Sequence, residues 1–111
     1  MPSSETNVSS PPADVVMFRT PFCGYCVMAA RLLAKKGANV REIDVSGNSE
    51  CRKWLYEVTG MRTVPQVFIN GRSVRGFEDL VALDRRGQLD PLLREAPTAA
   101  SLLQSPCAAP L

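Results

Sequence analysis

The sequence predicts a single α/β domain in which a mixed four-stranded sheet is flanked by helices. Two observations carry this expectation. Short apolar runs that suit strands alternate with stretches of helical periodicity, and a hairpin signal, Asn70-Gly71, follows them. Strands that alternate with helices and then form a hairpin give a mixed sheet, in the order β-α-β-α-β-β-α-α. With 111 residues the chain can form one compact domain and no more.

The first strand and helix have clear local signals. Residues 15–18 form a short apolar run that is typical of a buried strand. Apolar residues then recur at helical spacing over 25–36. The last turn of this segment carries two lysines, which complement the negative end of the helix, and Gly37 ends it.

The next strand and helix follow in the same way. The alternation of apolar and charged residues over 40–45 predicts a half-exposed strand. A helix then runs to about Thr59. Ser46 and Asn48 are both candidates for its N-cap, and Gly60 ends it.

The second half of the chain contains the expected hairpin and two further helices. Residues 64–69 predict the third strand, and the hairpin turn leads into a fourth strand at 73–75. A third helix is expected from about Phe77 to Gly87, followed by a short last helix over 90–95.

The two ends of the chain differ in composition from the middle. Residues 1–13 are rich in serine and proline and carry one charge, whereas residues 96–111 carry three prolines and no charged side chain. Neither segment shows a sustained period. We therefore expect two disordered tails around a folded domain at 14–95.

Composition and charge exclude several classes of function. Thirteen basic and 11 acidic residues are too evenly balanced to favour nucleic acid or an anionic membrane surface as a partner. The chain has no histidine, which excludes Ser-His-Asp hydrolysis, a Cys-His protease pair and any zinc site that needs imidazole. No apolar run approaches the roughly 20 residues of a membrane span, and the N-terminus lacks the pattern of a secretory signal. We therefore expect a cytoplasmic protein.

The cysteines are the main candidates for chemistry. A C-x-x-C motif, Cys23 to Cys26, stands where the first predicted strand meets the first predicted helix. A cysteine at a helix N-terminus faces unpaired backbone N–H groups and the positive end of the helix dipole, and both lower its pKa. We therefore expect Cys23 to be the nucleophile. Cys26, one turn into the helix and more buried, is expected to be the resolving thiol.

Half of a zinc site is the structural alternative for this motif. Without histidine it would need Cys51 and Cys107 as its other two ligands, and the sequence favours a redox pair over this arrangement. We expect Cys51 to be an incidental thiol on the second helix. Cys107 is expected to be exposed in the tail, where it could form intermolecular disulfides.

A second constellation is the Arg-Thr-Val-Pro segment at 62–65. A proline at the start of a strand has no N–H to donate, which leaves an edge free to receive the backbone of a ligand. The simpler alternative is that Pro65 merely begins an edge strand. Whether the Val64–Pro65 bond is cis is left open by the sequence.

Four segments together resemble the glutaredoxin family. They are Val16-Met17-Phe18, Cys23-Gly24-Tyr25-Cys26, Arg62-Thr63-Val64-Pro65-Gln66-Val67-Phe68-Ile69-Asn70-Gly71 and Gly76-Phe77-Glu78-Asp79-Leu80. The resemblance spans the expected domain in order, and the combination of C-x-Y-C, T-V-P and a later G-x-x-D is more specific than C-x-x-C alone. It implies a thioredoxin fold and glutathione-dependent thiol–disulfide exchange on protein–glutathione mixed disulfides and protein disulfides.

The resemblance also implies a glutathione site. Val64 would pair through its backbone with the cysteine unit of glutathione, Asp79 would bind the γ-glutamyl ammonium, and Arg62 would meet the glycyl carboxylate. Backbone N–H groups at Phe77 and Glu78 would hold the γ-glutamyl carboxylate. The complete set of expected glutathione-binding residues is Tyr25, Arg62, Thr63, Val64, Pro65, Gly76, Phe77, Glu78 and Asp79.

Three positions depart from the pattern of the family. Thr20 stands where many members carry a lysine, which leaves Arg19 or Arg62 to supply that positive charge. Arg75 replaces the first residue of a Gly-Gly pair, so the backbone there approaches a ligand less freely. Glu78 stands where a small hydroxyl residue or aspartate is common. We expect these changes to weaken the affinity for glutathione rather than the chemistry.

Other functions stay open at this point. Family members with a small residue at the position of Gly24 can hold a [2Fe–2S] cluster between two subunits, through the first cysteine, here Cys23, and bound glutathione. A general thioredoxin-like disulfide reductase is a second alternative. A non-catalytic interaction domain is a third, and it leaves Cys23 unexplained. We expect a monomer, with a dimer only if the cluster is bound, and glutathione and glutathionylated or disulfide-containing proteins as partners.

Overall fold

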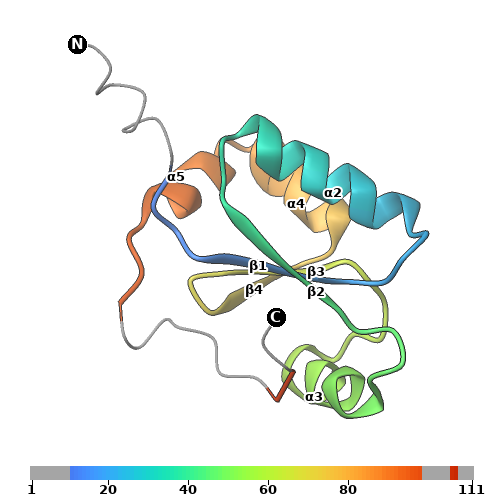
Figure 1. The fold of residues 1–111 in the computed structure, drawn as a ribbon. Helices are drawn as coiled ribbons and strands as arrows, with labels where there is room; N and C mark the ends of the chain where they lie inside the picture. The colour runs from blue at the N-terminus through green and yellow to red at the C-terminus, as the bar shows by residue number, and fades with distance from the viewer. Residues whose placement is uncertain (1–10, 99–105, 108–111) are drawn as a thin grey trace.

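The computed structural model describes residues 11–98 and 106–107, in which eight helices and strands follow the predicted order (Figure 1). Their bounds are β1 Val15–Arg19, α2 Gly24–Lys35, β2 Val40–Asp44, α3 Ser49–Thr59, β3 Gln66–Ile69, β4 Arg72–Arg75, α4 Phe77–Arg85 and α5 Leu89–Arg94. The strands form one mixed sheet in the order β2-β1-β3-β4. This confirms the predicted α/β architecture. Among the described residues, no helix is both long and apolar enough to cross a membrane.

β1 is paired along both of its edges. It runs parallel to β2 and antiparallel to β3, so that Val16 lies opposite both Arg41 and Phe68. Residues 15–18 are all buried. A strand that is covered on both faces needs apolar side chains on both, which explains the continuous apolar run in the sequence.

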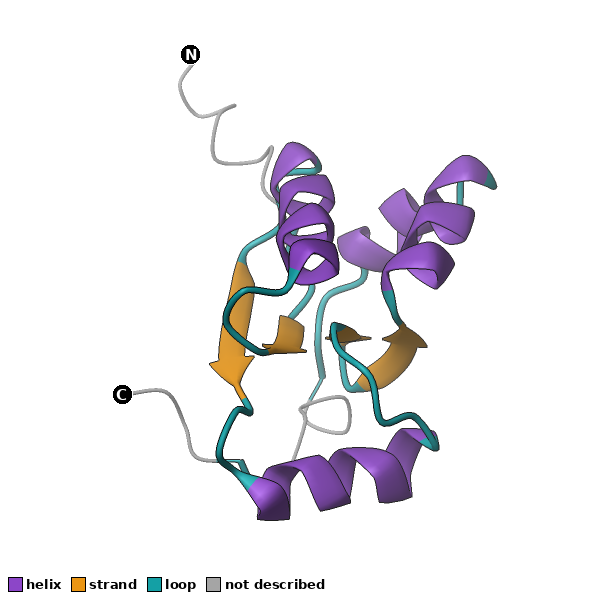
Figure 2. Cartoon of the chain, turned by 90° about the vertical axis from the view of Figure 1, so that its right-hand side faces the viewer, coloured by secondary structure: helices purple, strands orange, loops and turns teal. Residues whose placement is uncertain are grey.

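Helices cover both faces of the sheet. α2, α4 and α5 lie on one face, and α3 lies on the opposite face (Figures 1 and 2). The core is accordingly divided into two clusters of buried residues. The first is Ala13, Val15, Met17, Ala29, Leu33, Val67, Ile69, Leu80, Leu89 and Leu93. The second, which we call the α3-side cluster, is Val16, Phe18, Val45, Cys51, Leu55, Phe68 and Cys107. Alternate residues of β1 belong to alternate clusters because successive side chains of a strand point to opposite faces.

The ends of α3 follow local signals. Asn48, rather than Ser46, is the N-cap, and its side-chain oxygen accepts the backbone N–H of Cys51 at 3.0 Å. At the other end Gly60 has a φ of 75°, a left-handed conformation that glycine adopts without steric cost, and its N–H donates to the carbonyl of Tyr56.

β3 begins two residues later than predicted. The expected strand started at Val64, but the structure starts it at Gln66. Pro65 has no N–H to contribute to a ladder, so regular pairing cannot extend through it. The Val64–Pro65 peptide bond is cis.

The expectation that Cys51 and Cys107 are separate free thiols is wrong. They form an intramolecular disulfide that joins positions 56 residues apart, with their Cα atoms 5.0 Å from each other. Both half-cystines are buried in the α3-side cluster. The bond also removes the two ligands that the zinc alternative required. Spacing along the chain carries no signal for a pair this far apart, because only the fold brings them together.

Segments at both ends of the expected domain pack against it. Pro106 and Cys107 lie beside α3 (Figure 1), where Cys107 is bonded to that helix. Near the other end, Ala13 is buried and its N–H donates to the carbonyl of Leu93 at 3.1 Å. The remaining parts of the two expected tails, residues 1–10, 99–105 and 108–111, lie outside the described residues.

Replacing Cys107 with serine is expected to lower the free energy of unfolding by up to about 4 kcal/mol. A disulfide that closes a loop of this length lowers the conformational entropy of the unfolded chain, which destabilises the unfolded state by roughly that amount. Urea unfolding of the oxidised wild type and of Cys107→Ser measures the difference. Cys23→Ser serves as the control, because it removes a thiol that is outside this disulfide. Equal unfolding midpoints for wild type and Cys107→Ser would show that the disulfide contributes nothing to stability.

Candidate functional site

The turn after β1 places Cys23 at the N-terminus of α2. Cys23 is the N-cap residue, and its Sγ accepts the backbone N–H of Cys26 at 3.2 Å. A helix-terminal donor therefore points at this sulfur, in the arrangement expected from the sequence. Cys23 is partly exposed and Cys26 is buried. Of the two sulfurs, that of Cys23 is the one that a substrate disulfide can reach.

Burial raises the pKa of the Cys26 thiol from 9.0 to about 11. Its hydrogen bond with Cys23 raises this pKa as well, whereas a backbone hydrogen bond at Thr20 and the charge of Arg19 lower it. Cys26 is therefore a neutral thiol at physiological pH. It does not compete with Cys23 as a nucleophile while both are reduced.

Arg19 supplies positive charge to both thiols. It is the last residue of β1, and its charge interacts with the sulfurs of Cys23 and Cys26. Its guanidinium donates to Oε1 of Glu42 on β2 at 2.7 Å, and this hydrogen bond raises the pKa of Arg19. Of the two arginines proposed to compensate for Thr20, Arg19 is the one whose field reaches the thiols.

A groove of about 330 Å³ lies beside the N-terminus of α2. It is lined by Tyr25, Met61, Thr63, Val64, Pro65, Gly76, Phe77, Glu78 and Asp79. Every expected glutathione-binding residue except Arg62 is in this lining, and Met61 is an addition. The fold thus brings three separate segments of the chain together at one groove.

Aromatic packing and a close backbone approach shape this groove. The rings of Tyr25 and Phe77 lie 5.9 Å apart between centroids, which joins α2 to the start of α4. A Cβ added at Gly76 would lie 3.4 Å from the carbonyl oxygen of Pro65. The turn before α4 therefore packs against the proline loop at ordinary van der Waals distance.

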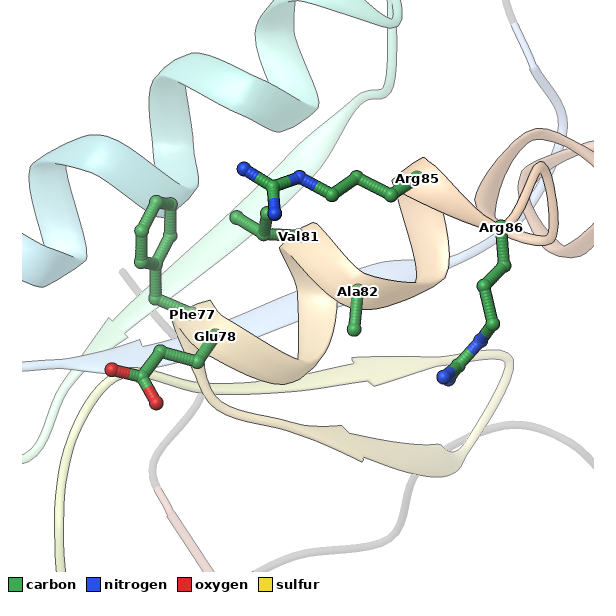
Figure 3. A pocket seen from close by; sticks show the side chains of 6 residues that line it. All are labelled: Phe77, Glu78, Val81, Ala82, Arg85 and Arg86. Atoms are coloured by element: carbon green, nitrogen blue, oxygen red, sulfur yellow. The ribbon is translucent and has the colours of Figure 1, made fainter.

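A second hollow of about 380 Å³ continues along α4. It is lined by Phe77, Glu78, Val81, Ala82, Arg85 and Arg86 (Figure 3). Phe77 and Glu78 line both hollows. Figure 3 shows Phe77 directed toward α2 and Arg85 extended over Val81. A ligand that leaves the groove along α4 would therefore meet positive charge.

Asp79 and Arg75 interact at the N-terminus of α4. Oδ2 of Asp79 accepts the N–H of Gly76 at 3.3 Å, and Nε of Arg75 lies 3.9 Å from the same oxygen. The carboxylate expected to bind an ammonium group thus already has an arginine beside it. Arg75 has a φ of 71°, and a non-glycine residue in this left-handed region costs about 1 kcal/mol or more. The substitution of arginine for glycine at this position therefore has a backbone cost.

Gln66 organises the loop between α3 and β3, and the sequence alone does not single it out as a site residue. Its buried side chain donates from Nε2 to the carbonyls of Met61 and Thr63, each at 3.0 Å, and its Oε1 accepts the hydroxyl of Thr59 at 2.9 Å. These bonds hold the backbone on both sides of Arg62. A polar residue inside an otherwise apolar strand is the signal that could have revealed this role, because buried amides need partners.

Arg62 lies over the ring of Tyr56. Its Cζ is 4.1 Å from the ring centroid, within the range of a cation–π interaction. None of the ion pairs within the described part of the chain involves Arg62. The ring therefore holds the guanidinium without neutralising it, and both chain neighbours of Arg62, Met61 and Thr63, line the groove. Tyr56 is a second residue whose role the sequence does not indicate, since the contact forms across the end of a helix.

Comparison with known proteins places the chain in a family. The Glutaredoxin family model matches residues 15–74, which is more than half of the sequence. The chain belongs to the glutaredoxin family. Glutaredoxin-C6 of Oryza sativa subsp. japonica is 41% identical over 102 residues, which cover 89% of this chain and 88% of the relative. Glutaredoxin 3 of Escherichia coli K12 is 42% identical over 82 residues, which cover 74% and 99%.

A solved structure gives the same result. The buckwheat glutaredoxin–glutathione complex matches this fold with a TM-score of 0.69 and 30% identity, over 81% of this chain and 84% of that one. The resemblance seen in the sequence is thereby confirmed, together with its thioredoxin fold. This glutaredoxin is a thiol–disulfide oxidoreductase that uses glutathione as its co-substrate.

The stability of this glutaredoxin is expected to fall as the pH rises from about 9 to about 11. The folded state holds the proton of Cys26 up to about pH 11, whereas an unfolded thiol loses it near 9, so folding is progressively penalised through this window. Cys26→Ser, which has no thiol to titrate at that position, is expected to show a shallower fall. Urea unfolding at several pH values measures both slopes, and parallel slopes would contradict the raised pKa.

Proposed function

We propose that this glutaredoxin reduces protein–glutathione mixed disulfides, with Cys23 as the nucleophile and the groove beside α2 as the glutathione site. The observation that carries the proposal is the position of the Cys23 sulfur. It is partly exposed, it accepts a helix N-terminal N–H, and it belongs to the same helix end as Tyr25, which lines the groove. Nucleophile and binding groove are thus held by one structural unit.

In the first step the Cys23 thiolate attacks the glutathione sulfur of the mixed disulfide. A bond forms between these two sulfurs, and the bond to the protein substrate breaks. The substrate sulfur leaves with the electron pair and takes up a proton. The N–H of Cys26 and the charge of Arg19 stabilise negative charge on Cys23 before the attack.

The Cys23–glutathione adduct is then resolved by a second glutathione. Its thiolate attacks the bound glutathione sulfur, which forms oxidised glutathione and returns Cys23 to the thiolate. For a protein disulfide the first adduct joins Cys23 to the substrate. Cys26 then loses its proton and attacks the Cys23 sulfur; the bond to the substrate breaks, and the substrate sulfur leaves as a thiolate that takes up a proton. Two glutathiones reduce the resulting Cys23–Cys26 disulfide and are themselves joined as oxidised glutathione. Cys26 must lose its proton before it can act in this second route, because only the thiolate attacks a disulfide.

The shape of the groove supports one orientation of glutathione. Its cysteine unit would lie along Val64, with its sulfur toward Cys23. Its γ-glutamyl end would lie at the N-terminus of α4, where backbone N–H groups attract a carboxylate and Asp79 attracts the ammonium. Arg62, held by Tyr56, would receive the glycyl carboxylate at the other end of the groove.

The [2Fe–2S] alternative places the cluster between two copies of the chain. Such clusters are held by four thiolates, or by thiolates together with imidazoles. Of the cysteines in the described residues, Cys26 is buried and Cys51 is bonded to Cys107, which leaves Cys23 as the accessible thiolate. A cluster would therefore need a second copy of the chain and thiolates from outside it. We propose the monomer as the active form for thiol–disulfide exchange.

Serine variants of the two active-site cysteines separate the two routes. Cys23→Ser is expected to lose both activities, because no other accessible thiolate replaces it. Cys26→Ser is expected to retain the reduction of a glutathionylated peptide and to lose most reduction of a protein disulfide. A coupled glutathione assay measures both reactions. Equal loss of both activities in Cys26→Ser would contradict the assigned roles.

The roles of Arg62 and Tyr56 in binding can be tested by comparing glutathione with a shorter thiol that lacks the glycyl unit. Arg62→Gln is expected to raise the KM for glutathione about tenfold, because it removes a charge-assisted contact. Tyr56→Leu is expected to raise it about two- to fivefold, and Tyr56→Phe to leave it unchanged, since the ring supplies the cation–π contact. kcat should not change.

The control for these variants is γ-glutamylcysteine, which has no glycyl carboxylate. With this thiol as the reductant, wild type, Arg62→Gln and Tyr56→Leu are expected to have the same KM. An unchanged KM for glutathione in Arg62→Gln would rule out a role for Arg62 in binding. An unchanged KM for glutathione in Tyr56→Leu, together with a raised KM in Arg62→Gln, would rule out a role for the ring.

A further inference from the structure

The residue that precedes the nucleophile is fully exposed. Phe22 has a relative exposure of 104%, and its φ of 59° lies in the left-handed region. A bulky side chain rarely adopts this backbone conformation, and it gains nothing here from burial within the domain. Intramolecular packing therefore does not account for a phenylalanine at this position. Contact with another molecule would.

Further exposed apolar side chains lie near the start of α2. Val27 and Met28 are 39% and 46% exposed. Gly24 precedes Met28 by one helical turn on the same strip of the helix, and a Cβ added at Gly24 would meet nothing within 4 Å. Val27 lies on the side of this strip away from Tyr25. We call Phe22, Gly24, Val27 and Met28 the Phe22 surface. It is open and uncharged.

The Phe22 surface is separate from the glutathione groove. Tyr25 contacts Phe77 and lines the groove, whereas no residue of the Phe22 surface lines it. A glutathionylated protein brings two halves to one sulfur–sulfur bond. When the glutathione half fills the groove, the polypeptide half has to contact surface outside the groove.

We propose that the Phe22 surface docks the polypeptide half of the substrate and favours an apolar side chain next to the glutathionylated cysteine. The inference rests on the proposed function and adds a substrate class to it. Phe22 is adjacent in the chain to the nucleophile, so a polypeptide whose disulfide reaches Cys23 comes within reach of this surface. An exposed aromatic residue is the type that most often anchors such contacts.

Two glutathionylated peptides that differ only in the residue before cysteine test this proposal. Wild type is expected to turn over the leucine peptide with a kcat/KM about fivefold or more above that of the serine peptide, since leucine buries apolar area on Phe22. Phe22→Asn is expected to bring this ratio close to one, because asparagine tolerates left-handed backbone but has no ring. Phe22→Tyr is expected to retain the ratio.

Two controls distinguish docking from a general effect. The mixed disulfide of glutathione and 2-mercaptoethanol has no polypeptide, so Phe22→Asn should turn it over within about twofold of wild type. Val58→Asn changes a side chain that is 51% exposed on α3, on the opposite face of the sheet, and should retain the peptide preference. No preference in wild type, or equal losses on all three substrates in Phe22→Asn, would overturn the docking role. No turnover of any substrate by wild type would instead overturn the proposed function.

Discussion

The pairing of β1 on both edges is the constraint that fixes where Cys23 lies relative to the loop that carries Val64. A shift of β1 by one residue would move every one of its side chains to the opposite face of the sheet. Phe18, near the end of β1, pairs with Gln66 at the start of β3. Antiparallel pairing therefore brings the loop that enters β3 next to the turn that leaves β1. Cys23 lies in the second of these segments and Val64 in the first.

Much of the fold and part of the site could be predicted because their signals are local. The Asn48 and Gly60 caps, the Asn70-Gly71 turn and the C-x-x-C motif at a strand–helix junction each depend on a few consecutive residues. Most of the groove lining followed from motifs that resemble the family. Arg62 is the exception, because its side chain lies on an aromatic ring that no local motif specifies.

The features that the sequence did not reveal all depend on contacts between distant parts of the chain or on backbone conformation. The amide of Gln66 joins a strand to the loop before it and to the end of α3. Arg75 occupies a left-handed conformation because the turn before α4 requires it, although the residue type disfavours it. The Cys51–Cys107 disulfide depends on where the chain passes after its last helix. None of these features produces a periodic pattern or a fixed residue spacing in the sequence.

The Cys51–Cys107 disulfide also implies an order of events during synthesis of the protein. Among the described residues every helix and strand precedes Cys107 in the chain, so synthesis has passed all of them before the second half of this bond exists. Cys51, within α3, therefore stays a thiol until that point. Closure of the bond is consequently a late event in the synthesis of the chain.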